Sequence, residues 1–228
     1  MRILAISDIH GSQKAQKRLK NTSKKVDLIL IAGDITVFGS HIEDIMKKIN
    51  YLNKKTLLIT GNHEIPSQVR KLTKRFRNIY FMNNKVMKIN GLMIYGYDTN
   101  GFSFKDRIFE KDSKKFVKAI KEEEKRIRGL KKKEIIKAKS KLKTKNPKIK
   151  NKIKEFKTIL ISHAPPYKTK CDKIMDEHCG SKSVREFCIK QQINYCFCGH
   201  LHEAGHTVDK LKKTIVVNPG PYGMVFEI

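Results

Sequence analysis

The stretch Thr60-Gly61-Asn62-His63-Glu64 follows a short apolar run, residues 56–59, that is typical of a strand. A glycine turn at that point directs an amide, an imidazole and a carboxylate into one crevice. In parallel α/β sheets, ligands bind in such a crevice at the carboxyl ends of the strands. Taken alone, a turn rich in Gly, Asn and His indicates only a turn. The pattern recurs, however, at the ends of four other apolar runs.

These four runs end in polar residues that can also bind a ligand. They are residues 2–6, followed by Asp8 and His10; residues 27–32, followed by Gly33 and Asp34; residues 158–161, followed by His163; and residues 193–198, followed by His200 and His202. Each ending has an ordinary alternative, such as a helix cap or a turn. Five coincidences at the same end of one kind of element indicate instead a shared site on an α/β fold.

The remaining apolar spacing predicts the other elements of this fold. Helices are expected over about residues 12–23, 40–52, 66–76 and 183–191. Asn90-Gly91 lies between two short apolar runs and predicts a hairpin. An antiparallel margin or a second sheet is therefore expected beside the parallel core, with further strands over residues 214–217 and 224–228.

Length and composition narrow the class of protein. The 228 residues suit a single domain, 1–228, and the net charge of +28 comes mostly from lysine. Such a charge favours polyanion partners or reflects the lysine bias of heat-adapted organisms. No apolar run approaches the roughly 20 residues that cross a bilayer, so no membrane contact is expected. Because the N-terminus lacks a signal-peptide pattern and the five cysteines lack a scaffold spacing, we expect a cytoplasmic protein.

Residues 105–157 differ from the rest, with 23 basic and 8 acidic side chains. Phe116, Ile120, Ile127 and Leu130 keep a helical period, and a second helix is expected after Gly129, ending near Asn146-Pro147. We interpret this range as a basic helical insertion. It is either a solvated charged hairpin or a surface for nucleic acid, although it has few aromatic residues for base stacking.

The polar residues at the five strand ends have the chemistry of metal ligands. Their oxygen and nitrogen donors, without thiolate, favour Mn, with Fe, Zn or Ni as alternatives. They are too many for one four-coordinate zinc, whereas two ions that share a carboxylate use them all. Two further histidines, His41 and His178, do not follow any of these five strands directly. His41 is expected at the surface, and a Cys/His zinc site near Cys171 and His178 lacks a known spacing.

The ordered series of motifs resembles the calcineurin-like metallophosphoesterase superfamily, and in particular its small prokaryotic phosphodiesterase-like members. The series is Asp8-x-His10, Gly33-Asp34, Gly61-Asn62-His63-Glu64, Ser162-His163-Ala164-Pro165-Pro166, Gly199-His200-x-His202 and Asn218-Pro219-Gly220. The resemblance implies a two-sheet α/β sandwich flanked by helices. It also implies one divalent ion on Asp8, His10 and His202 and a second on Asn62, His163 and His200, bridged by Asp34.

The resemblance further implies a phosphoesterase, and a phosphodiesterase before a monoesterase. Two cations lower the pKa of a shared water, so that hydroxide can attack phosphorus. By resemblance, His63 protonates the leaving oxygen or stabilises the transition state. Glu64 either orients an imidazole or acts as a helix N-terminal acid. The alternatives are a nuclease or nucleic-acid-binding protein that uses the basic insertion, and a non-catalytic scaffold. The oligomeric state stays open.

Overall fold

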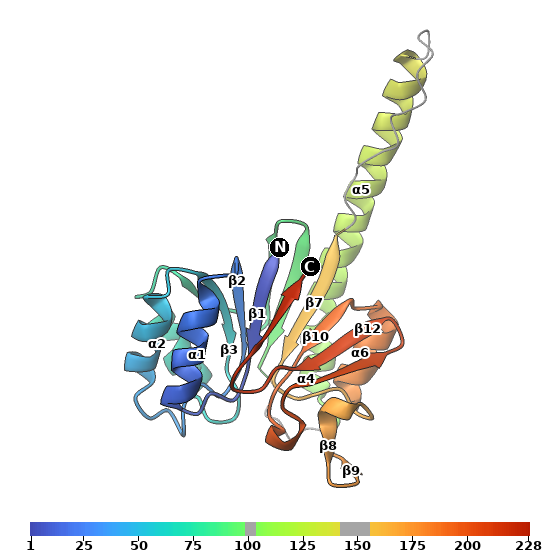
Figure 1. Cartoon of the computed structure of the whole chain (residues 1–228). Helices are drawn as coiled ribbons and strands as arrows, with labels where there is room; N and C mark the ends of the chain where they lie inside the picture. The colour runs from blue at the N-terminus through green and yellow to red at the C-terminus, as the bar shows by residue number, and fades with distance from the viewer. Residues whose placement is uncertain (99–103, 142–155) are drawn as a thin grey trace.

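The computed structural model describes residues 1–98, 104–141 and 156–228, and over residues 131–141 it describes the backbone alone. A five-stranded sheet and a six-stranded sheet form the body of the molecule (Figure 1). In the first sheet, four strands run parallel because each is connected to the next by a crossover, while the last strand of the chain adds antiparallel to the first. Its order is β13 (Met224–Glu227), β1 (Arg2–Ile6), β2 (Leu28–Ala32), β3 (Lys55–Ile59) and β4 (Ile79–Phe81).

The second sheet has a parallel centre and an antiparallel hairpin at each margin. Its order is β11 (Thr207–Leu211), β12 (Thr214–Asn218), β10 (Tyr195–Phe197), β7 (Lys157–Ser162), β6 (Leu92–Tyr97) and β5 (Lys85–Ile89). The predicted hairpin at Asn90-Gly91 is the β5–β6 pair. Strand β11 was not predicted, because this edge strand alternates half-buried and exposed residues and has no apolar run.

The two sheets pack face to face, and helices cover their outer faces. The interior between the sheets is apolar, with Leu30 and Leu57 from the first sheet and Ile94 and Ile159 from the second fully buried. Helices α1 (Gln13–Ser23), α2 (Ile42–Asn50) and α3 (Pro66–Thr73) lie on the first sheet; α4 (Arg107–Asp112), the start of α5 (Lys114–Lys141) and α6 (Lys182–Gln191) lie on the second. The expected two-sheet sandwich flanked by helices is therefore confirmed (Figure 1).

Helix α5 carries most of the described part of the basic insertion. It runs without a break through Gly129, so the expected second helix after that residue is wrong: a lone glycine on an exposed helix surface does not end a helix. Phe109 and Phe116 are fully buried against the second sheet, so the first turns of the insertion belong to the core. The predicted helix end at Asn146-Pro147 lies outside the described residues. Figure 1 shows α5 starting near one edge of the sheets and projecting beyond the other.

In the described ranges, no helix combines the length and the apolar character that crossing a membrane requires. The two termini lie side by side at one edge of the sandwich, where the Met1 amino group donates a hydrogen bond to the Ile228 carbonyl over 2.8 Å (Figure 1). The opposite edge, at the carboxyl ends of β1, β2, β3, β7 and β10, holds the polar loops that the sequence singled out.

Candidate metal centre

Backbone hydrogen bonds tie the loops after the five strands to one another. The Asp8 amide donates to the Gly33 carbonyl over 3.1 Å, and the Gly199 amide donates to the His163 carbonyl over 3.0 Å. Each of these bonds joins two loops of one sheet, and the Ser7 amide, which donates to the Gly220 carbonyl over 3.2 Å, joins the loops of the two sheets. All of the predicted site residues lie in these loops, namely Asp8, His10, Asp34, Asn62, His63, Glu64, His163, His200 and His202.

Asp8, His10 and His202 form one candidate metal-binding group, with ligand atoms within 4.8 Å of one another. The Nε2 atoms of His10 and His202 are 3.0 Å apart. The carboxylate of Asp8 is buried, and its Oδ1 accepts a hydrogen bond from the His200 amide over 2.9 Å. Its Oδ2 has no hydrogen-bond partner among the described residues. A buried carboxylate oxygen in that state fits a cation as its missing partner.

Asp34, His163 and His200 form a second candidate group within the same distance limit. Asn62 adds its amide oxygen, which lies 3.1 Å from His163 Nε2 and 3.0 Å from His200 Nδ1. Asp34 Oδ2 lies 3.2 Å from His163 Nε2 and 3.8 Å from His10 Nε2, between the two groups. Its position suits a carboxylate that two ions share.

In the second group Asp34 and His163 form a buried ion pair: burial opposes the charge of His163, but Asp34 raises its pKa, so a bound cation would displace that proton. Burial opposes the charge of Asp34, but the hydrogen bond and positive charge of His163 outweigh it, and the pKa of Asp34 is lowered. Burial and then the neighbouring His163 lower the pKa of His200 to about 4, so its imidazole is neutral at pH 7. His163 is fully buried with its Nδ1 2.8 Å from the Ala32 carbonyl, which directs Nε2 toward Asp34.

Several of the predicted ligands adopt backbone conformations that L-residues rarely occupy. Asp8, His10, Asp34 and His200 have φ angles of 54°, 43°, 53° and 73°. Such residues cluster at functional sites, where the surrounding structure holds them in place against the strain. Gly61 makes this packing possible, because a Cβ atom there would overlap the Asp34 carboxylate and lie 2.6 Å from His163 Cε1.

His63 forms a third candidate group with His10 and Asp34, and one of its ring nitrogens is already engaged. Its Nδ1 accepts a hydrogen bond from the Phe38 amide over 3.2 Å, and its ring centroid lies 4.4 Å from that of Phe38 and 4.6 Å from that of His10. In a neutral imidazole that accepts at Nδ1, the proton is on Nε2. His63 is therefore a hydrogen-bond donor at Nε2.

Glu64 differs from the expectation that it orients an imidazole. Its buried carboxylate accepts hydrogen bonds from the backbone amides of Asp34 (3.1 Å), Thr36 (2.9 Å) and Gly61 (3.1 Å), and from the Thr36 hydroxyl (2.8 Å). The side chain points back beneath its own turn and thus joins the loop after β3 to the loop after β2. Glu64 therefore positions the predicted ligands indirectly, by binding backbone amides of the loops that carry them.

The two other histidines singled out from the sequence lie elsewhere. His41 is exposed at the start of α2. His178 Nδ1 is 2.7 Å from the carboxylate of Asp172. Within the described ranges, none of the residue groups that could hold a metal includes a cysteine, and the cysteines there are free thiols.

Asp98 is a feature of this edge that sequence reasoning missed. Its Oδ1 accepts a hydrogen bond from the Thr60 amide over 3.1 Å, beside the Asn62 turn. A signal was present, because Asp98 directly follows the apolar strand β6, in the same way as the ligands follow theirs. The predicted strand stopped at Tyr95, too early to show it.

We predict that Asp98 destabilises the metal-free fold at neutral pH. Burial raises the pKa of Asp98 to about 7, although its hydrogen bond with Thr60 opposes the shift. The folded state therefore binds the proton more tightly than the unfolded state, and stability falls as pH rises from about 4 to about 7. Asp98→Asn keeps the acceptor without the charge. Thermal unfolding in EDTA should show a gain on the order of 2 kcal/mol at pH 8 that shrinks toward pH 4; an equal gain at both pH values contradicts the prediction.

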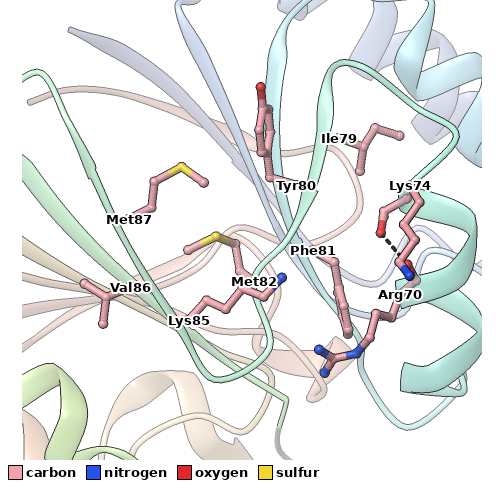
Figure 2. Close-up of a pocket in the computed structure, with 10 residues that line it drawn as sticks. Arg70, Lys74, Ile79, Tyr80, Phe81, Met82, Lys85, Val86 and Met87 are labelled. Atoms are coloured by element: carbon pink, nitrogen blue, oxygen red, sulfur yellow. Dashed lines mark hydrogen bonds between the residues drawn. The ribbon is translucent and has the colours of Figure 1, made fainter.

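A pocket of about 260 Å³ between α3, β4 and β5 lies apart from these groups. Figure 2 shows the Arg70 side chain beside Phe81, with Met82, Val86 and Met87 along the strand side. The Arg70 guanidinium lies 5.5 Å from the centre of the Phe81 ring. None of the ten lining residues is an acid, a histidine or a cysteine, so this pocket offers no strong metal ligand.

Comparison with known proteins agrees with this geometry. The family model described as calcineurin-like phosphoesterase matches residues 1–204. The uncharacterized protein MJ1162 of Methanocaldococcus jannaschii is 30% identical over 97% of this chain and 88% of its own length. Among solved structures, TT1561 of Thermus thermophilus has a TM-score of 0.66 at 14% identity, covering 97% of this chain and 89% of that one. A dimetal phosphatase from Danio rerio has a TM-score of 0.54 at 11% identity, covering 95% and 86%. The chain therefore belongs to the calcineurin-like phosphoesterase family.

Proposed function

We propose that this protein is a dinuclear metal-dependent phosphoesterase that acts on phosphodiesters. Membership of the family indicates a hydrolase of phosphoesters. The observation that carries the finer proposal is the position of Asp34 between two ligand groups. In the proposal, Asp8, His10 and His202 hold one ion, Asn62, His163 and His200 hold the other, and Asp34 joins them. Mn is the favoured metal, and Fe, Zn or Ni also suit these donors.

The residues of the chain have separate tasks in this reaction. The two cations, when bound, lower the pKa of water and offset charge on the phosphoryl oxygens. His63 holds a proton at Nε2, which it gives to the leaving oxygen. Glu64 keeps the loops of Asp34 and Gly61 in register. The His202 side chain is 58% exposed, so this part of the site is open to solvent.

The contacts of three predicted ligands favour a diester over a monoester. The hydrogen bonds and ion pairs that Asp8, Asp34 and Asn62 make with described residues reach histidines and backbone amides. None of these contacts brings in a Lys or Arg side chain, and on this basis we propose the substrate of lower charge, a diester. A cytoplasmic location is proposed on separate grounds, because the free cysteines suit a reducing compartment.

The proposal is tested by Mn²⁺-dependent hydrolysis of an aryl phosphodiester and of the matching aryl monoester. We expect the diester to be the better substrate, EDTA to stop turnover and Mn²⁺ to restore it. Asp34→Asn should abolish turnover, because it removes the charge shared by both groups. Faster monoester hydrolysis would indicate a phosphatase instead. An inert protein that nevertheless binds two metal ions would indicate a scaffold or a very selective enzyme.

A second candidate function is nucleic-acid binding by the basic insertion. Lys114, Lys118, Lys121 and Lys125 recur along one face of α5 and line a groove of about 1070 Å³ against α6. Three glutamates line the same groove, so its charge is mixed. Deletion of the whole insertion would also remove Phe109 and Phe116 from the core, so lysine substitution is the better test.

A further inference from the structure

An exposed apolar surface lies beside the proton donor. Phe38 is 79% exposed with a φ angle of 47°, and its ring lies 4.4 Å from that of His63. Val37 and Ile65, which lie close to these two residues in the chain, are 44% and 63% exposed. A large apolar side chain that is exposed, on a backbone that is strained, contributes little to the stability of the fold. Its position beside His63 places it where a leaving group departs.

A second aromatic surface follows His163 in the chain. The rings of Tyr167 and Phe104 meet edge to face at 4.9 Å. The Lys182 ammonium lies 4.2 Å from the centre of the Phe104 ring and 5.3 Å from that of Tyr167. Tyr167 stands four positions after His163, so their Cα atoms are at most about 14 Å apart. The surface is therefore within one or two substrate units of the metal centre.

The loop that carries this second surface is built around a buried carboxylate. Asp172 is fully buried and accepts hydrogen bonds from the amides of Lys168 (3.0 Å), Thr169 (2.8 Å) and Gly180 (3.0 Å), besides its contact with His178. The same loop forms η1 (Lys170–Asp172), β8 (Lys173–Ile174) and β9 (Glu177–His178), and both η1 and β8 lie against η2 (His202–Ala204), which begins at a predicted ligand. The surface is thus preorganised, which lowers the entropic cost of binding.

Exposure and charge suit this surface to a nucleotide. Phe104 is 45% exposed and Tyr167 half-buried, so part of each ring stays open to solvent beside its contacts with the other ring and with the lysines. The ammonium groups of Lys168 and Lys182 lie over the rings, and Arg185 donates to the Tyr167 carbonyl over 2.7 Å. Aromatic rings that stack bases, combined with cations that track phosphates, are the recognition pattern of single-stranded nucleic acid.

The two surfaces belong to different sheets and flank the same edge. Phe38 follows β2 of the first sheet, and Tyr167 follows β7 of the second, where β8 and β9 project in Figure 1. A phosphodiester carries one ester group on each side of phosphorus. We propose that the substrate is an internucleotide phosphodiester, with the leaving nucleoside on Phe38 and the retained nucleotide on Tyr167 and Phe104. This inference rests on the proposed function.

The reaction balances with water as the only co-reactant. The oxygen of water bonds to phosphorus and the bond from phosphorus to the leaving oxygen breaks. His63 gives its Nε2 proton to that leaving oxygen, and the proton released by the attacking water restores His63. The products are one nucleotide with a terminal phosphomonoester and one nucleoside or shorter strand with a free hydroxyl.

The test compares kcat/KM for a dinucleotide and for methyl 4-nitrophenyl phosphate, which has no group for the second surface. Tyr167→Ala and Phe104→Ala should lower the ratio of the two values about 5- to 150-fold, because stacking contributes about 1–3 kcal/mol per base. Tyr167→Phe keeps the ring and should restore most of the ratio. Tyr51→Ala, an exposed aromatic at the end of α2, is the matched control and should leave the ratio unchanged.

Four other results would contradict these proposals. Turnover of the methyl ester without turnover of a dinucleotide or a hexanucleotide overturns the inference and leaves the proposed function standing. Equal losses on both substrates assign Tyr167 a structural role and also overturn it. If neither diester is hydrolysed, both proposals fail. A triple variant of Lys118, Lys121 and Lys125 to Gln that loses hexanucleotide turnover while the aromatic variants retain it moves recognition to the insertion.

Discussion

Replacing His63 with alanine is expected to lower kcat about 10²- to 10⁴-fold on a diester with an alkyl leaving group. The reason is the proton at Nε2, which the hydrogen bond from the Phe38 amide to Nδ1 fixes in place. An alkoxide is a poor leaving group and needs that proton. A 4-nitrophenolate leaves without one, so the loss on a 4-nitrophenyl diester should be much smaller.

The measurement is kcat for both leaving groups, together with the metal content of each protein. His41→Ala is the matched control, because His41 is exposed at the start of α2 and should change neither quantity. Equal losses for both leaving groups would show that His63 stabilises charge and is not an acid. Loss of one metal equivalent would instead make His63 a ligand, an outcome that its closeness to His10 and Asp34 allows.

The edge that carries the site could be predicted from the sequence because a chemical signal and a topological signal coincide there. Buried parallel strands appear as continuous apolar runs, and β2 has five buried residues in a row before Gly33. The polar residue after such a run necessarily lies at the carboxyl end of its strand. The strand-end pattern therefore predicted that Asp34 and His163 share one edge, although 129 positions separate them, and the family resemblance assigned them to the same ion.

The direction in which a side chain points was harder to predict than its place in the chain. Glu64 lies where the sequence indicated, but it turns beneath its own loop to accept three backbone amides, and no sequence pattern encodes that rotation. The aromatic surface of Tyr167 and Phe104 was missed for a related reason. Its two rings come from loops 63 positions apart, and neither ring follows a strand directly.

Helix α5 shows a different limit. Its apolar residues Phe116 and Ile120 indicated a helix correctly, but Gly129 was wrongly interpreted as a helix end. The cost of an interior glycine is only about 1 kcal/mol, which the neighbouring strong helix formers offset. The residue at which a helix ends depends on free-energy differences of this small size, whereas the existence of the helix depends on larger ones.

Gly61→Ala is expected to lower diester kcat/KM about 10²-fold and the affinity for Mn²⁺ by a factor of about 10 or more. A Cβ at this position would overlap the Asp34 carboxylate and approach His163 Cε1 to 2.6 Å. Neither residue can move freely, because Asp34 Oδ1 accepts from the His63 amide over 2.9 Å and His163 is fully buried. Relief of the overlap must therefore displace the carboxylate between the two ligand groups.

Mn²⁺ titration by calorimetry, steady-state kinetics and thermal unfolding separate a displaced carboxylate from a general loss of structure. Gly129→Ala is the matched control, since nothing lies within 4 Å of its added Cβ in α5. That variant should gain about 1 kcal/mol of stability with unchanged kinetics and metal affinity. Overpacking at Gly61 should cost about 1–3 kcal/mol in the metal-free protein. Wild-type affinity and turnover in Gly61→Ala would show that Asp34 need not stand between the two groups, and the dinuclear assignment would then lose its central residue.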